Sequence, residues 1–290
     1  MTSKNFSHSG VCAVVGMAVY REDRLNWVEQ AVESILSQTF TDFMYYIVID
    51  GDVSDEILTF FVELEKRDQR VVIKRNAYNM GLSSCMNSVI EAEQHYSPKY
   101  FFRMDSDDVS FPERFINQIT FLENNPEVSI LGTSLVEINE NGEKVGKRKL
   151  PSSHSDIYRV LPKRCAINHP TVCLRFDIFQ SGWRYKEHLK NTQDYFLWAD
   201  LVSNGYKFAN LSEPLLSFRR VNDFYKRRGL GKSLNEFKAR FYTMRALNRF
   251  SIGNVFYAFS VLFLRLMPGK IVKLAYRIDR YFLNRSVKHE

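Results

Sequence analysis

The sequence has few cysteines, no long apolar run near its start and few acidic residues near its end. Its four cysteines, Cys12, Cys85, Cys165 and Cys173, show no CxxC spacing, which disfavours a zinc ribbon or a thioredoxin-like redox site. So few cysteines suit a reducing cytosol. No basic and then apolar signal peptide opens the chain, and we expect residues 1–10, which are polar, to be flexible. With 45% hydrophobic and 25% charged residues, the composition excludes a disordered or collagen-like chain.

The shortage of acidic residues leaves the C-terminal part strongly basic. From Leu215 to Glu290 there are 17 Lys and Arg against 4 Asp and Glu, whereas the first 214 residues hold 23 basic and 29 acidic residues. The net charge of +7 therefore comes from one end of a mildly acidic protein. This distribution argues against a nucleic-acid-binding protein and favours contact with the anionic inner leaflet of a membrane.

The same basic part is also apolar. The segment 254–267 is apolar apart from one Asn, one Ser and one Arg, and it is too short to span a bilayer, which takes roughly 20 residues. A second helical pattern over 270–282 places basic residues beside an apolar stripe. We therefore predict a basic amphipathic region over 221–290 that attaches peripherally to the membrane. The alternative is that these helices pack on the protein itself.

The first 220 residues alternate between strand-like and helical patterns. Strands are expected over about 11–19, 43–50, 70–74 and 100–104, with helices between them over about 25–36, 55–67 and 81–95. This order predicts an α/β fold with a mostly parallel sheet and helices on both faces. Such sheets bind ligands at the carboxyl ends of their strands.

An acidic cluster follows the fourth predicted strand. In Asp105-Ser-Asp-Asp108, extended geometry would turn Asp105 and Asp107 to one side and Asp108 away. Clustered carboxylates suit Mg²⁺ or Mn²⁺, which would also bind the phosphates of a nucleotide. The alternative is a solvated turn with no ligand.

Several ordered blocks resemble the family 2 inverting glycosyltransferases of the GT-A fold. The resemblance runs over about residues 11–219, and its main blocks are 31–43, 79–87, 103–114, 168–171 and 193–198. It implies a GT-A domain over 11–220 that transfers a sugar from a sugar nucleotide with help from a divalent cation.

The resemblance also implies roles for particular residues. Asp50 would contact the nucleoside base, and Tyr20 ends the strand that would bind the nucleotide. Asp105 would lie near the ribose and the metal, and Asp107 would be the main metal ligand. Asp194 would be the general base, because a single displacement needs a carboxylate near the acceptor hydroxyl; the alternative is an acidic residue that only stabilises the first turn of a helix.

Two further residues are candidates for binding the donor or the acceptor. His169 precedes Pro170 in a loop and could approach the acceptor or the pyrophosphate, or be structural. Arg219 follows a strand-like segment and could hold a phosphate group of the donor or acceptor.

These features together predict an inverting hexosyltransferase. It would use a UDP-sugar, carrying galactose or an N-acetylhexosamine, and extend a lipid-diphosphate-linked saccharide of an O-antigen or capsule at the cytoplasmic face of the membrane. A sugar-1-phosphate nucleotidyltransferase is disfavoured, since residues 15–24 contain one Gly and no Lys. A catalytically silent sugar-nucleotide-binding subunit remains an alternative, and the oligomeric state is left open.

Overall fold

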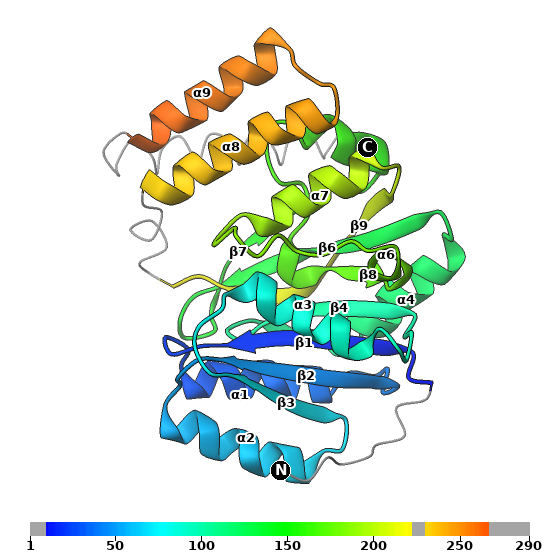
Figure 1. Cartoon of the computed structure of the whole chain (residues 1–290), viewed down its shortest axis with the longest axis vertical. Coiled ribbons are helices and arrows are strands. Elements are labelled where there is room, and N and C mark those ends of the chain that lie inside the picture. The colour runs from blue at the N-terminus through cyan, green and yellow to red at the C-terminus, as the bar shows by residue number, and fades with distance from the viewer. Residues whose placement is uncertain (1–9, 222–229, 267–290) are drawn as a thin grey trace.

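A computed structural model describes residues 10–221 and 230–266. The described chain folds around one nine-stranded sheet, flanked by helices (Figure 1). Its first four strands pair in parallel in the order β3-β2-β1-β4. They are β1 (Ala13–Val19), β2 (Phe43–Asp50), β3 (Val71–Asn76) and β4 (Tyr100–Asp105). These strands match the predicted ones closely, because each is a short apolar run between helical segments.

The second half of the sheet is mixed. It consists of β5 (Val109–Ser110), β6 (Val128–Ile138), β7 (Lys144–Arg148), β8 (Cys173–Arg175) and β9 (Lys207–Arg219). Strand β8 joins β4 to β6 with antiparallel pairing on both sides, β9 runs parallel to β6, and β5 and β7 pair antiparallel at the margins. The predicted α/β fold is confirmed, with the parallel arrangement limited to the first four strands and the β6–β9 pair.

Helices cover both faces of the sheet, as predicted. On one face, Val15 and Met17 of β1 pack in a core with α1 (Leu25–Leu36), α2 (Asp55–Arg67) and α4 (Arg114–Asn124). On the other face, Val14 packs in a second core with the remaining helices of the domain. These are α3 (Leu82–Glu93), α5 (His154–Val160), α6 (Asp177–Gln180) and α7 (Gln193–Ser203). The alternation of neighbouring strand residues between two cores is what a sheet buried on both faces requires.

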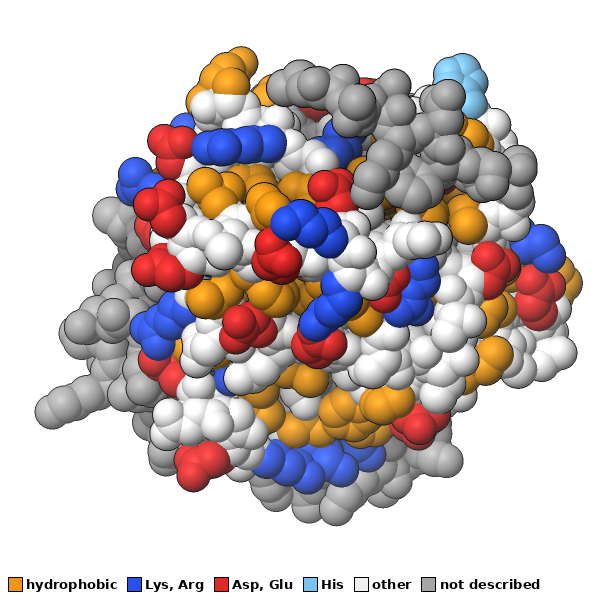
Figure 2. Space-filling model, turned by 90° about the horizontal axis from the view of Figure 1, so that it is seen from below, with side chains coloured by type: hydrophobic (Ala, Val, Ile, Leu, Met, Phe, Trp, Pro, Cys, Tyr) orange, Lys and Arg blue, Asp and Glu red, His pale blue; other side chains and the backbone are white. Residues whose placement is uncertain are grey.

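The last two described helices extend the second layer. Helix α8 (Leu230–Ala246) packs on α7, and α9 (Ile252–Leu266) packs on α8, so that the three form a stack at the end of the molecule away from β3 (Figure 1). At the opposite end, around α2, acidic and basic side chains are interspersed (Figure 2). Among the described helices, none has both the length and the apolar character needed to cross a bilayer.

Parts of three predictions fall on residues that the structure does not describe. Of the N-terminal segment expected to be flexible, only Gly10 is described, and the helical pattern over 270–282 lies wholly outside. The boundary near residue 220 adjoins residues 222–229, which are also not described. The division at that point stays a prediction.

Candidate active site

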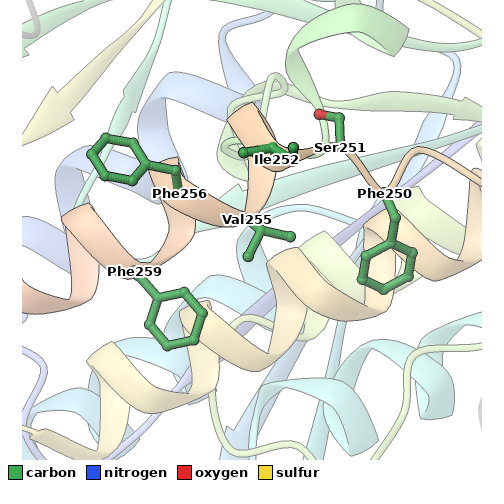
Figure 3. Close-up of a pocket in the computed structure, with 6 residues that line it drawn as sticks. All are labelled: Phe250, Ser251, Ile252, Val255, Phe256 and Phe259. Atoms are coloured by element: carbon green, nitrogen blue, oxygen red, sulfur yellow. The ribbon is translucent and has the colours of Figure 1, made fainter.

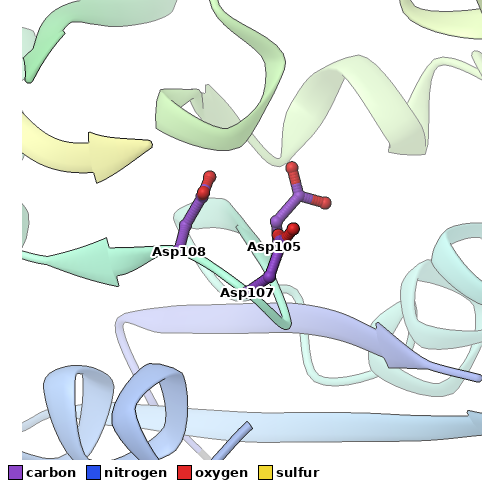
Figure 4. A group of neighbouring side chains, drawn as sticks. All are labelled: Asp105, Asp107 and Asp108. Carbon is purple, nitrogen blue, oxygen red and sulfur yellow. The ribbon is translucent and has the colours of Figure 1, made fainter. Parts of the chain in front are cut away.

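The acidic cluster forms a tight turn at the carboxyl end of β4. Carboxylate oxygens of Asp105, Asp107 and Asp108 all lie within 4.8 Å of one another (Figure 4). Asp108 thus shares the cluster, and the prediction that it turns away is wrong. The extended backbone ends at Asp105, and the turn at residues 106–107 brings the carboxylate of Asp108 back toward that of Asp105.

Burial and mutual repulsion make the carboxyl groups of Asp107 and Asp108 hard to ionise. The pKa of Asp107 is raised to about 7, mainly by burial and then by the charges of Asp105 and Asp23. The pKa of Asp108, whose side chain is fully buried, is also raised far above its usual value, by burial and by its two acidic neighbours. A divalent cation would remove this repulsion, and three carboxylates suit Mg²⁺ or Mn²⁺. The residues present therefore fit a cation site.

Arg219 holds the acidic turn in place. Its backbone N–H donates to Asp108 Oδ1 at 2.9 Å, and its Nε donates to the carbonyl oxygen of Asp107 at 2.8 Å. Its Nη2 donates to Gln30 Oε1 at 2.7 Å, and its Nη1 lies 3.2 Å from the carbonyl oxygen of Glu140. The side chain is buried. Phosphate binding by Arg219 stays a prediction, because the contacts that the structure shows are all with the protein.

Asp23 belongs to the site and was missed by sequence reasoning. It accepts a hydrogen bond from the backbone N–H of Tyr20 at 2.9 Å, just beyond the end of β1. Burial raises its pKa to about 6, opposed by hydrogen bonds from Tyr20 and from the Ser106 side chain. Asp23 thus ties the loop after β1 to the acidic turn and holds Tyr20, whose predicted contact with the nucleotide is untested. The sequence feature that points to Asp23 is its position shortly after the first predicted strand, which places it at the same edge of the sheet as Asp105.

Asp50 anchors a loop at the next strand end. Its Oδ1 accepts hydrogen bonds from Asn76 Nδ2 and from the Met80 backbone N–H, and its Oδ2 accepts one from the Gly81 N–H, each at 2.8 Å. The turn after it requires Gly51, which has a φ of +87°, because a Cβ there would come within 2.9 Å of the Asn79 nitrogen. The contact of Asp50 with a nucleoside base stays a prediction.

Asp194 lies in the first turn of α7, where the sequence predicts a helix start. Burial raises its pKa, while the backbone N–H of Tyr195 and the positive charge of Arg103 hold it down. The helix is entered through Thr192, whose φ of +60° is left-handed, a conformation that costs a β-branched residue free energy. A raised pKa of this kind marks a candidate functional residue, and the role of Asp194 as the general base stays a prediction.

Arg103 couples Asp194 to the acidic turn. It projects from β4, is buried, and forms an ion pair with Asp105. Its charge also opposes the pKa increases of Asp107, Asp108 and Asp194. Its Nε and Nη1 have no hydrogen-bond partner among the described residues. One buried cation thus acts on both parts of the site, and no pattern in the sequence indicates this role.

His169 lies beneath the site and is hydrogen bonded. Its Nε2 is 3.0 Å from the Tyr185 hydroxyl oxygen, and its ring packs against Trp198. Burial and the nearby Arg103 lower its pKa well below the usual value, so it is neutral. Tyr185 is in turn fixed by Asn87, which exchanges two hydrogen bonds with its backbone at 2.9 and 3.0 Å. These contacts are structural, and an approach of His169 to the acceptor or pyrophosphate stays a prediction.

The family follows from comparison with known proteins. The sequence model described as glycosyl transferase family 2 matches residues 14–183, which is more than half of the chain. The chain belongs to glycosyl transferase family 2. The enzyme is 31% identical over 268 residues to the amylovoran biosynthesis glycosyltransferase AmsE of Erwinia amylovora, a match that covers 91% of this chain and 97% of that protein.

Two further comparisons extend this assignment. The glycosyltransferase is 29% identical over 280 residues to UDP-Gal:alpha-D-GlcNAc-diphosphoundecaprenol beta-1,3-galactosyltransferase of Escherichia coli, covering 92% of this chain and 96% of that protein. The crystal structure of S. aureus TarS 1–349 in complex with UDP matches it with a TM-score of 0.58 at 19% identity, over 84% of this chain and 74% of that one. This likeness shows a shared fold, and the predicted GT-A fold is confirmed.

Proposed function

We propose that this family 2 glycosyltransferase transfers a hexose from a UDP-sugar to a lipid-diphosphate-linked saccharide during synthesis of a bacterial surface polysaccharide such as an O-antigen or capsule. One observation carries the proposal: the positive charge of the buried Arg103 acts on both the acidic turn and Asp194. The names of AmsE and of the Escherichia coli galactosyltransferase support a polysaccharide and a lipid-linked acceptor. Galactose or an N-acetylhexosamine is the proposed sugar.

The acidic turn is the proposed site for a Mg²⁺ or Mn²⁺ ion. Asp107 and Asp105 would be its main ligands, with the Asp108 carboxylate within the same cluster. A cation bound there would act as a Lewis acid toward the departing diphosphate and would orient it. Asp23 and Arg219 would keep the ligands in place through the hydrogen bonds described above.

Asp194 is the proposed general base. Its carboxylate would accept the proton of the acceptor hydroxyl as that oxygen attacks the anomeric carbon and the bond from this carbon to the UDP oxygen breaks. A raised pKa makes the carboxylate a better proton acceptor, and the positive charge of Arg103 opposes the increase. Inversion follows, because attack and departure occur on opposite sides of the sugar.

The nucleotide would lie across the carboxyl ends of β1, β2 and β4. Tyr20 and Asp50, at two of these ends, are the proposed contacts for the nucleoside. His169 and Arg219 are proposed to approach the pyrophosphate or the acceptor. A lipid-linked acceptor would confine the reaction to the inner leaflet of the cell membrane, so we propose a peripheral position for the enzyme.

The variant Asp194→Asn tests the proposal directly. With a radiolabelled UDP-sugar and a diphosphate-linked acceptor, we expect transfer to fall by about 10²–10⁴-fold, while the donor dissociation constant from calorimetry stays within about twofold of the wild-type value. Asp177→Asn is the matched control, since Asp177 also lies in a first helical turn but is exposed. Near-normal turnover of Asp194→Asn would refute the assignment, and absence of UDP release by the wild type would favour a silent subunit.

A further inference from the structure

One face of α9 is apolar and exposed from Ile252 to Phe263. Ile252, Phe256 and Phe263 are 92%, 73% and 61% exposed. These positions recur at helical spacings of four and seven residues, so they form a single stripe, which we call the α9 stripe. Ile252 and Phe256 also line a shallow groove with Ser251 and Val255 (Figure 3). Contiguous exposed apolar surface of this kind marks an interaction site.

The opposite face of α9 is already packed. Ala258 is fully buried and Asn254 nearly so. Phe259 lies at the edge between this face and the α9 stripe, where its ring contacts Phe237 and Phe241 of α8 edge to face. The α9 stripe is therefore not the side by which the helix joins the protein. It is the side left over once that contact has been made.

The charge around the α9 stripe indicates what it binds. From Phe237 to Leu266, which covers part of α8 and all of α9, the sequence has five Lys and Arg and no Asp or Glu. Apolar side chains on a helix within a basic segment favour an anionic lipid surface. A second copy of this chain is disfavoured, because pairing two such stripes would bring two basic segments together.

We propose that α9 lies in the plane of an anionic membrane, with the α9 stripe inserted among the lipid acyl chains. At 15 residues, α9 is about 22 Å long, which suits a helix lying along the surface. The stack of α9 on α8 and of α8 on α7 then holds Asp194 at a fixed position relative to the leaflet. The role of this membrane contact in the reaction rests on the lipid-linked acceptor proposed above. The binding of α9 to the membrane does not depend on that acceptor.

Vesicle binding by the full-length protein tests the proposal without donor or acceptor. Co-sedimentation would use vesicles of phosphatidylcholine, either pure or with about one third phosphatidylglycerol. The wild type is expected to bind the anionic vesicles and to bind pure phosphatidylcholine weakly. The double variant Phe256→Ser/Phe263→Ser should bind the anionic vesicles at least about 100-fold more weakly, since each buried Phe contributes roughly a factor of ten or more.

The matched control is Val62→Ser/Val145→Ser, which removes two exposed apolar side chains from α2 and β7. It should bind as the wild type does. Because Phe256 and Phe263 are exposed, their replacement should leave circular dichroism and hydrolysis of the UDP-sugar unchanged. These two measurements show that the variant has folded.

Three outcomes would overturn the proposal. The wild type could fail to bind anionic vesicles. The double variant could bind as well as the wild type, or it could turn a wild-type dimer into a monomer, which would make the stripe an interface between copies. Transfer to a short-chain, water-soluble acceptor is measured separately, so a wild-type protein that transfers the sugar but does not bind anionic vesicles refutes this inference and leaves the proposed function standing.

Discussion

Replacing Arg219 by Ala separates two roles for this residue. If Arg219 is a phosphate ligand, its truncation should lower the affinity of the protein for the donor with little effect on folding. If Arg219 instead fixes the acidic turn, a role we call the clamp, its truncation should first lower the stability of the protein and, as a consequence, its affinity for the cation. The hydrogen bonds from Nε to the Asp107 carbonyl oxygen at 2.8 Å and from Nη2 to Gln30 Oε1 at 2.7 Å favour the clamp.

The size of the effect follows from the bonds that are lost. Gln30 is exposed and Asn139 and Glu140 are half-buried, so water can replace their contacts with Arg219. The bond from Nε to the Asp107 carbonyl oxygen lies inside the turn and is worth about 1.5–3 kcal/mol because the donor is charged. Loss of packing over the Trp27 ring, 5.2 Å from the guanidinium, adds less. We therefore expect a loss of about 2–3 kcal/mol in the free energy of unfolding, or roughly 5–10 °C in Tm.

Two measurements on the same variant decide the question. Urea unfolding gives the stability, and calorimetric titration with a UDP-sugar in EDTA gives nucleotide affinity in the absence of a cation. Arg24→Ala is the matched control: Arg24 stacks on the same Trp27 ring at 4.2 Å but pairs with Glu140 on the surface, so its loss should cost less than about 1 kcal/mol. If Arg219→Ala unfolds like the wild type and loses affinity in EDTA, the clamp is wrong and Arg219 is a ligand.

Three further predictions concern the same site. Because the pKa of Asp107 is raised to about 7 in the folded protein, its ionisation increasingly destabilises the cation-free protein as pH rises toward about 7. Asp107→Asn should therefore raise stability in EDTA by an amount that grows from about pH 4, the pKa of an unfolded Asp, to about pH 7 and is constant above it, and should abolish cation-dependent donor binding. Thr192→Gly should remove the strain of a left-handed Thr and so raise the stability measured by thermal unfolding by about 1 kcal/mol. It should also slow transfer, because the backbone that leads into α7 and positions Asp194 becomes less rigid. Asp50→Asn should cost about 1–3 kcal/mol in urea unfolding, since an amide cannot accept all three hydrogen bonds, and should speed hydrogen exchange in residues 76–81.

Each of these predictions has its own control. For Asp107, the control is to compare the stability of the wild type and of Asp107→Asn in Mn²⁺ instead of EDTA. If the variant is still the more stable protein in Mn²⁺, the repulsion argument is wrong. For Thr192, the control is Ser97→Gly, another left-handed residue in the loop between α3 and β4, which should gain stability without any change in transfer. Unchanged exchange in residues 76–81 of Asp50→Asn would show that other contacts hold the loop.

The fold and the acidic turn could be predicted because they depend on local patterns. Apolar runs that alternate with helical spacing fix the first four strands, and parallel strands bring Asp50 and Asp105 to one edge of the sheet. The error at Asp108 has a local cause as well. The rule of alternation holds only while the chain stays extended, and the chain turns immediately after Asp105.

The roles of Arg219, His169 and Asp23 could not be read in the same way. Arg219 Nε donates to the carbonyl oxygen of Asp107, 112 residues away in the chain, and no sequence spacing reveals this contact. Burial and the nearby Arg103 lower the pKa of His169, and both depend on the tertiary fold. Asp23 is a single acidic residue in a loop, and only its contact with Tyr20 and Ser106 identifies it.

The position of α8 explains how a helix far from the acidic turn bears on the reaction. Asp200, six residues after Asp194 on α7, forms an ion pair with Lys186 at 2.8 Å, and Lys186 Nζ donates to the Tyr242 hydroxyl of α8 at 2.7 Å. Tyr242 also donates to Asp200, so the three groups fasten α7 to α8. Because Asp194 lies at the other end of this short helix, a shift of α8 would move the carboxylate relative to the fixed turn at the end of β4. The distance between Asp194 and the acidic turn, on which the proposed single displacement would depend, is therefore set in part by the helices that carry the exposed stripe.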